Sequence, residues 1–321
     1  MQPTLKTSHN LTIQNKAIID LGTNTFHLLI GSALEGEIVE LYQQQIPVMI
    51  GAGVINEGFI TIQAYQRGMQ ALTEFNASIK KYRVSKIVAT GTSAIRNAKN
   101  GEQFLAEIKT RFGYDVQHIS GDREAELIYK GVSKSFPFPA EPVVVMDIGG
   151  GSVELIIGIQ NTILWKQSFE VGAARLLERF NPSNPIKKEE INQIEDYLTS
   201  TFKPFAAALV QAKMGGKTCQ FLVGSAGSFD TLLDVLEADL KRKSAQVSSQ
   251  AFAVKEADAE LFYQTVIYSS QVDREKMNGL LPFRVDMIVV AIILMRHIAK
   301  NYGLNQIICS KYALKEGLLL V

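Results

Sequence analysis

The strongest constraint on the fold is one pattern that occurs twice in the chain. Residues 20–31 read DLGTNTFHLLIG, and residues 147–158, which follow the apolar run 143–146, read DIGGGSVELIIG. A shift of 127 positions aligns them as follows: Asp20 with Asp147, Gly22 with Gly149, Thr25 with Ser152, and Gly31 with Gly158. Each copy predicts a strand ending in an aspartate, a tight turn of small residues and a second strand. The duplication predicts two domains built on one plan.

The chain length and one proline-rich segment agree with two domains. The 321 residues exceed the usual size of a single domain. The segment 135–142, SFPFPAEP, carries three prolines and can join neither a helix nor a central strand. We therefore place an N-terminal domain at 1–135, with a polar tail at 1–15, and a C-terminal domain at 136–321.

The order of the elements within each half predicts an α/β fold. Apolar residues at helical spacing mark a helix over 62–82; they are Tyr65, Met69, Leu72, Phe75 and Ile79. A strand at 86–90, one helix over 93–112, a strand at 115–120 and a helix at 123–132 follow. In the second half we expect helices at 186–202, 286–297 and 312–320, and a polar surface loop at 240–250. This alternation predicts sheets covered by helices.

Charge and composition exclude several classes of function. The chain has 33 basic and 32 acidic side chains, so its net charge of +1 gives no general attraction for nucleic acid or an anionic membrane. The longest apolar run, 287–295, is too short to span a membrane, and the first fifteen residues lack the apolar core of a signal peptide. Cys219 and Cys309 lie in apolar runs that predict buried thiols. We expect a cytoplasmic protein.

The glycine turns admit two interpretations. A strand that runs through an aspartate into glycines exposes backbone N–H groups that can bind phosphate oxygens, while the aspartate orients a hydrated divalent cation or a water. Alternatively, each turn is a tight hairpin whose glycines only relieve strain. Two aligned copies, each led by an aspartate and each carrying Ser or Thr, favour phosphate binding across a cleft between the domains.

Three further segments carry candidate residues. Arg96, in TGTSAIRN, could bind phosphate, or it could be a solvated arginine in a helix capped by Thr92 or Ser93. Glu124 and Glu126 follow the Ser-Gly turn of HISGDREAEL, where acids more often stabilise a helix N-terminus than take part in catalysis. The turn VGSAGS, residues 223–228, could admit a ligand or only permit close packing. The histidines have no metal-ligand spacing, and the chain has no P-loop, G-x-S-x-G or G-x-G-x-x-G motif.

The combined motifs resemble one family. DLGTNTFHLLI, TGTSAIR, SGDREAELIYKGV, DIGGGSVEL and VGAARL occur in order between residues 20 and 176, and they resemble the exopolyphosphatase and guanosine pentaphosphate phosphohydrolase (Ppx/GppA) family of the actin-like ATPase superfamily. The resemblance implies two actin-like (RNase H-like) domains, each a mixed sheet flanked by helices, with a cleft between them.

The resemblance also implies roles for residues of this chain. Glu124 would be the base that activates water, and Asp147 and Glu154 would act with it in catalysis. Asp20, Asp147 and Glu154 would hold the cation, Mg²⁺ or Mn²⁺, or its water network. The implied phosphate contacts are Asn24, Thr25, Arg96, Gly149, Gly150, Gly151 and Ser152. GSAGS stands where the family commonly has a Gly-Thr-rich turn, so the residues around Ser225 receive no assignment.

These assignments predict an enzyme that removes the terminal phosphate of inorganic polyphosphate or of guanosine pentaphosphate. The near-neutral charge and the end of the chain at Val321 lead us to expect a preference for short polyphosphates. Two alternatives remain: a catalytically weak protein that binds polyphosphate or an alarmone, and an ATP-dependent kinase of the same superfamily. Whether the protein forms a homodimer is also open.

Overall fold

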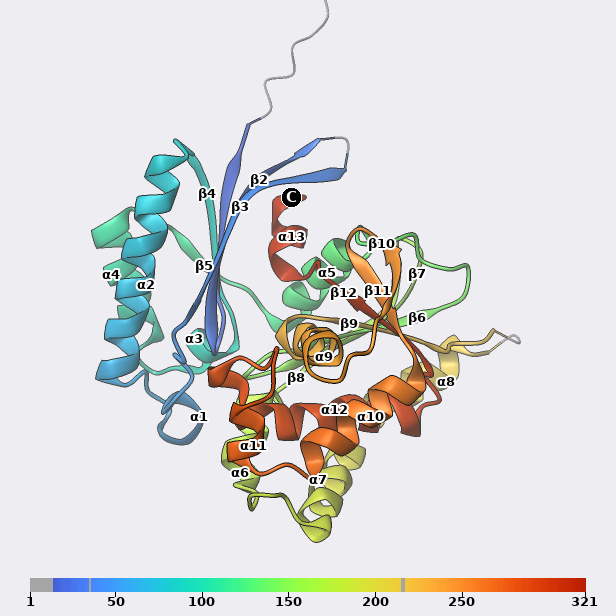
Figure 1. Ribbon diagram of the computed structural model, residues 1–321. Helices are drawn as coiled ribbons and strands as arrows, with labels where there is room; N and C mark the ends of the chain where they lie inside the picture. Colours follow the sequence, from blue (N-terminus) through green and yellow to red (C-terminus); the bar gives the residue numbers. More distant parts are fainter. Residues whose placement is uncertain (1–13, 35, 215–216) are drawn as a thin grey trace, which may run out of the picture.

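Two mixed β-sheets flanked by helices form the protein (Figure 1). The structure is a computed structural model that describes residues 14–34, 36–214 and 217–321. A five-stranded sheet has the order β3-β2-β1-β4-β5, and a seven-stranded sheet has the order β10-β11-β12-β9-β6-β7-β8. The strands are β1 Lys16–Leu21, β2 Thr25–Leu34, β3 Glu37–Pro47, β4 Lys86–Gly91, β5 Val116–His118, β6 Val143–Ile148, β7 Val153–Ile159, β8 Thr162–Phe169, β9 Phe221–Ser225, β10 Ala245–Ser248, β11 Ala251–Val254 and β12 Gln306–Ser310.

Helices cover both faces of the sheets. The α-helices are α1 Val54–Glu57, α2 Ile62–Lys81, α3 Ser93–Asn97, α4 Gly101–Phe112, α5 Gly121–Val132, α6 Ala173–Phe180, α7 Lys188–Thr201, α8 Lys203–Ala212, α9 Gly227–Ala238, α10 Glu256–Ile267, α11 Gln271–Glu275, α12 Met287–Asn301 and α13 Leu314–Leu319, with a 3₁₀ turn η1 at Pro282–Arg284. Among the described residues, no helix is both long and apolar enough to cross a bilayer.

The sequence duplication is a structural duplication. β1 and β2 form an antiparallel hairpin in which Asp20 lies opposite His27, and β6 and β7 form a second hairpin in which Asp147 lies opposite Glu154. In each case the second strand pairs with a third strand, and the register of that pair shifts at the equivalent glycine, Gly31 or Gly158. Each first strand also pairs in parallel with a later strand, β4 or β9. The predicted α/β fold with two related sheets is confirmed.

Two helices pack between the sheets (Figure 1). α5 lies against β8 and β7 of the second sheet, while α13, at the end of the chain, lies against α5 and against β1 and β2 of the first sheet. Gly131 of α5 and Gly317 of α13 lie at their crossing, where an added Cβ on either would collide with backbone of the other helix. The two sheets fall on either side of the predicted domain boundary at residue 135, which stays a prediction.

Two expectations for the elements were wrong. The single helix predicted over 93–112 is broken into α3 and α4: Ala98 is extended, and Asn100, before α4, accepts from and donates to the backbone of Ile60 with its side-chain amide, at 2.8 and 2.9 Å. The predicted surface loop at 240–250 contains β10, which pairs with β11 at the edge of the seven-stranded sheet. Its polar sequence has the composition of an edge strand rather than of a core strand.

Candidate active site

A cavity of about 170 Å³ lies where the two hairpin turns meet. Both turns line it, together with the start of α5 and with residues of η1, α12 and the segment 311–315. Nine of the predicted site residues lie in its wall: Asp20, Asn24, Thr25, Glu124, Asp147, Gly149, Gly150, Gly151 and Ser152. The fold therefore brings most of the predicted site together.

The glycine turn after β6 is shaped by contact with the first hairpin. Among the described residues, the glycines with left-handed φ are found elsewhere, so Gly149, Gly150 and Gly151 do not serve to relieve that kind of strain. An added Cβ on Gly150 would instead collide with the Asn24 amide, and one on Gly151 would collide with Ser93. Strain relief alone thus fails to explain these glycines. Their missing side chains let the two halves approach closely.

Hydrogen bonds fix the orientation of this turn. The carbonyl groups of Gly149 and Gly150 accept from the N–H groups of Ala173 and Ala174, each at 2.9 Å, so the turn satisfies the first donors of α6. Within the described part of the chain, the N–H groups of Gly150 and Gly151 donate to no backbone carbonyl. Unpaired N–H groups beside a cavity are suited to bind anionic oxygens.

Two equivalent aspartates are the next-to-last residues of β1 and β6, but they have different surroundings. Asp147 Oδ2 accepts a hydrogen bond of 2.7 Å from Ser225, the neighbouring residue on β9. The equivalent neighbour of Asp20 is Thr90, and here both the Asp20 Oδ1 and the Thr90 hydroxyl are buried without a partner. Burial raises the pKa of Asp147 to about 6, and burial followed by the charge of Asp147 raises the pKa of Asp20 to about 7. The first aspartate is the less well stabilised anion.

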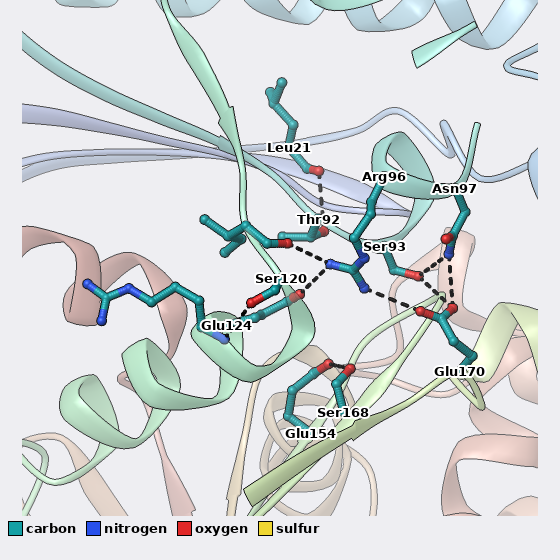
Figure 2. Close-up of polar contacts among 12 residues, drawn as sticks. Leu21, Thr92, Ser93, Arg96, Asn97, Ser120, Glu124, Glu154, Ser168 and Glu170 are labelled. Carbon is teal, nitrogen blue, oxygen red and sulfur yellow. Dashed lines mark hydrogen bonds and ion pairs between the residues drawn. The ribbon is translucent and has the colours of Figure 1, made fainter. Parts of the chain in front are cut away.

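Glu124 lies at the start of α5, close to Glu154 (Figure 2). Ser120 caps this helix by accepting from the N–H of Arg123 at 3.2 Å, and Gly121 allows α5 to begin directly against Ser168 of β8. Ser168 in turn donates to Glu154 Oε1 at 2.6 Å. A helix from the first half of the chain thus delivers a carboxylate to the second sheet.

Both glutamates are harder to ionise than in water. Burial, then the charge of Glu154, raises the pKa of Glu124 well above its ordinary range, while Arg96 opposes this. Burial, then the charge of Asp147, raises the pKa of Glu154 to about 8. A buried carboxyl with a raised pKa is suited to accept a proton near neutral pH.

Arg96 contacts the candidate base directly. Its Nη1 donates to Glu124 Oε2 at 3.3 Å and to the Ile119 carbonyl at 2.9 Å (Figure 2). The helix α3 that carries Arg96 has no side-chain cap from Thr92, so the interpretation as a solvated arginine in a capped helix is wrong. Glu126, two residues further along α5, instead pairs with Arg123 and Lys166 near the surface. The structure separates the two acids that the sequence could not.

A model of the Ppx/GppA phosphatase family matches residues 30–321. The chain belongs to this family. A Haemophilus influenzae protein whose name provisionally assigns it as an exopolyphosphatase is 27% identical over 323 residues, which cover 98% of this chain and 93% of that protein. The structure of an exopolyphosphatase from Cytophaga hutchinsonii is 36% identical with a TM-score of 0.88, covering 95% of this chain and 96% of the other.

A structure of the Aquifex aeolicus family member shares the fold, with a TM-score of 0.77 at 24% identity over 96% of this chain and 97% of the other. The fold is therefore the two-domain actin-like fold of the Ppx/GppA family. The family and its exopolyphosphatase members support a hydrolase that acts on polyphosphate, rather than a kinase.

The acids of the cleft fit a hydrated cation better than a cation that is coordinated by protein side chains alone. Within the described ranges, no three or more His, Cys, Asp or Glu side chains are grouped so that they could hold a metal ion directly. Mg²⁺, however, is commonly bound by one or two carboxylates, with waters and substrate phosphates completing its shell. The unpartnered Asp20 Oδ1 and the raised pKa of both aspartates match such a site. Asp20, Asp147 and Glu154 as cation ligands stay a prediction.

Several residues at this site were not identified from the sequence. Ser225 belongs to the unassigned VGSAGS turn, and its hydrogen bond to Asp147 gives that turn a role. In the same turn, Gly224 is needed for packing, because an added Cβ would collide with the Phe229 ring. Ser168 and Glu170 were also missed. The alignment of the two hairpins could have indicated Ser168, since β8 must lie beside Glu154 in the second repeat.

Proposed function

We propose that the protein is a magnesium- or manganese-dependent phosphohydrolase that removes the terminal phosphate of inorganic polyphosphate or of guanosine pentaphosphate. One observation carries the proposal: Glu124 is buried in the cleft with a raised pKa, and it is held between Arg96 and Glu154. A buried carboxylate of raised pKa that an arginine orients is suited to act as a general base for water. Hydrolysis places a proton from water on Glu124 while water oxygen attacks the terminal phosphorus and the bridging oxygen leaves with the shortened chain.

The remaining residues bind and orient the substrate in this proposal. The free N–H groups of Gly150 and Gly151 would bind phosphate oxygens, with Ser152 and Thr25 behind them in the wall and Asn24 across the turn. The cation, held by Asp20, Asp147 and Glu154, would neutralise phosphate charge. Ser225 and Ser168 keep Asp147 and Glu154 oriented. Positioning of this kind supplies most of the rate in phosphoryl transfer.

The proposal also concerns the length of the polyphosphate chain, the location of the protein and its oligomeric state. We propose a preference for short chains because the net charge is only +1, which offers a long polyanion few contacts outside the cleft. A cytoplasmic location and a homodimer stay predictions.

Purified protein should be incubated with labelled polyphosphate, guanosine pentaphosphate and ATP plus a candidate acceptor, each with and without magnesium. We expect free phosphate from at least one of the first two substrates, only when the cation is present. Binding without turnover would favour a catalytically weak protein that binds polyphosphate or an alarmone, and transfer of the label to an acceptor would favour the kinase. Either result would contradict the proposal.

A further inference from the structure

Glu170, the first residue after β8, is bonded by four side chains at once. Its carboxylate accepts from Ser93 Oγ at 3.0 Å and from Asn97 Nδ2 at 3.1 Å, both on α3 (Figure 2). Arg96 Nη2 donates to the other oxygen at 3.3 Å, and Arg175 Nη2 of α6 completes the set at 2.5 Å. Three donors come from the first half of the chain, and one comes from the second.

This donor set has the chemistry of a phosphate site. Two guanidinium groups, a hydroxyl and an amide converge on one half-exposed anion, and guanidinium groups are the side chains best matched to phosphate. The set also borders the glycine turn: an added Cβ on Gly151 would meet Ser93, and Arg175 Nε donates to the Gly151 carbonyl at 3.0 Å. The same Arg96 holds Glu124 through its other nitrogen.

We propose that the Glu170 carboxylate occupies the position of a substrate phosphate and is exchanged for it when substrate binds. The inference rests on the proposed function, and it adds Ser93, Asn97 and Arg175 to the phosphate contacts. Glu170 is 45% exposed, so its side chain can move into solvent without a buried charge being created. In the free protein it bridges the two halves. In the complex a phosphate of the chain makes the same contacts, and Glu170 thereby sets the apparent affinity.

The test uses Glu170→Gln, which keeps the shape and removes the charge. Binding of a methylene-bridged tripolyphosphate analogue, whose P–C–P links resist hydrolysis, is measured by calorimetry in the presence of magnesium. Because competition from a half-exposed carboxylate is removed, we expect binding about three- to tenfold tighter than in the wild-type protein. The matched control is Glu260→Gln, which removes one charge from a similarly exposed pair with Arg296 elsewhere in the second half. The control should bind as the wild type does.

A second measurement separates exchange from a purely structural bridge. Without ligand, Glu170→Gln should lower the melting temperature, and saturating analogue should remove most of that difference, because the carboxylate is already displaced in the complex. A difference that persists at saturation, or affinity that is unchanged or weaker, would overturn the proposal. Inorganic phosphate in place of the analogue shows whether one phosphate suffices for the exchange.

The two proposals fail separately. If wild-type protein hydrolyses polyphosphate but Glu170→Gln binds the analogue no more tightly, the exchange is wrong and the function stands. If Glu170→Gln binds more tightly but wild-type protein releases no phosphate, the exchange stands and the function is wrong.

Discussion

Replacing Asp20 with Asn should make the protein more stable, and increasingly so as pH rises. The Asp20 carboxyl is buried, its Oδ1 has no hydrogen-bond partner, and burial raises its pKa from 3.8 to about 7. Between these values the folded protein keeps a proton that the unfolded chain has released. The free energy of unfolding therefore falls as pH rises from about 4 to about 7, and levels off above the folded pKa.

The expected size follows from the same shift. Each pH unit over which only the folded state holds the proton costs about 1.4 kcal/mol, so from pH 5 to pH 8 Asp20 should cost about 2 to 3 kcal/mol. Asn has nearly the same shape and no charge to bury. The variant should thus lose this part of the pH dependence while keeping the parts due to Asp147 and Glu154, whose pKa values are raised to about 6 and about 8.

Urea unfolding at pH 5, 6, 7 and 8, without divalent cation, measures the difference. Asp115→Asn serves as the control, because it removes an aspartate that is 83% exposed and pairs with Lys109 at the surface. Equal pH dependence in wild type and Asp20→Asn would refute the reasoning. If Asp20 helps to hold the cation, magnesium at pH 8 should stabilise the wild type more than the variant.

Three further outcomes are expected. Glu124→Gln should lower kcat by about two to four decades with substrate binding largely kept, and unchanged turnover in a steady-state phosphate-release assay would remove Glu124 from the mechanism. Gly150→Val should abolish binding of polyphosphate, because its side chain would displace Asn24 and separate the hairpin turns. Circular dichroism verifies that the variant is folded, and calorimetry should then detect no binding. Normal affinity would contradict this. On a gel, all polyphosphate chains digested by the wild type should shorten gradually, and activity should fall only slightly as the salt concentration rises. Intact long chains together with free phosphate, and no chains of intermediate length, would contradict the short-chain preference.

The duplicated pattern predicted more of the fold than any other feature. Aligned repeats predicted both hairpins, and the structure gives them the same register and the same register shift against the third strand at Gly31 and Gly158. Local composition failed where tertiary contacts decide the backbone. The sequence of 93–112 contains no signal that Asn100 will form hydrogen bonds with the distant Ile60. The polar segment β10 is a strand because it pairs with β11 at the edge of the sheet.

The candidate site could be predicted only in part for the same reason. Residues in the turns, such as Asp147 and Gly150, follow from the repeat, because a repeated turn has a fixed place in each sheet. Ser225 and Glu170 depend on which strand lies beside which, and this is set by the crossing connections. Glu170 directly precedes the VGAARL motif, but that motif says nothing of what the Glu170 side chain contacts. Only the contact between α3 and the start of α6 explains it.

The packing of α5 explains why the acids of this cleft must be considered together. By sequence α5 precedes the predicted boundary, yet it packs on the second sheet, so Glu124 is positioned by the same strands that carry Glu154 and Asp147. Arg96, in contrast, is held by α3 beside the first sheet. Arg96, which lowers the pKa of the base, thus reaches it from the side of the first sheet. The contact between α3 and α5 therefore opposes the rise in the Glu124 pKa that burial and the neighbouring acids cause.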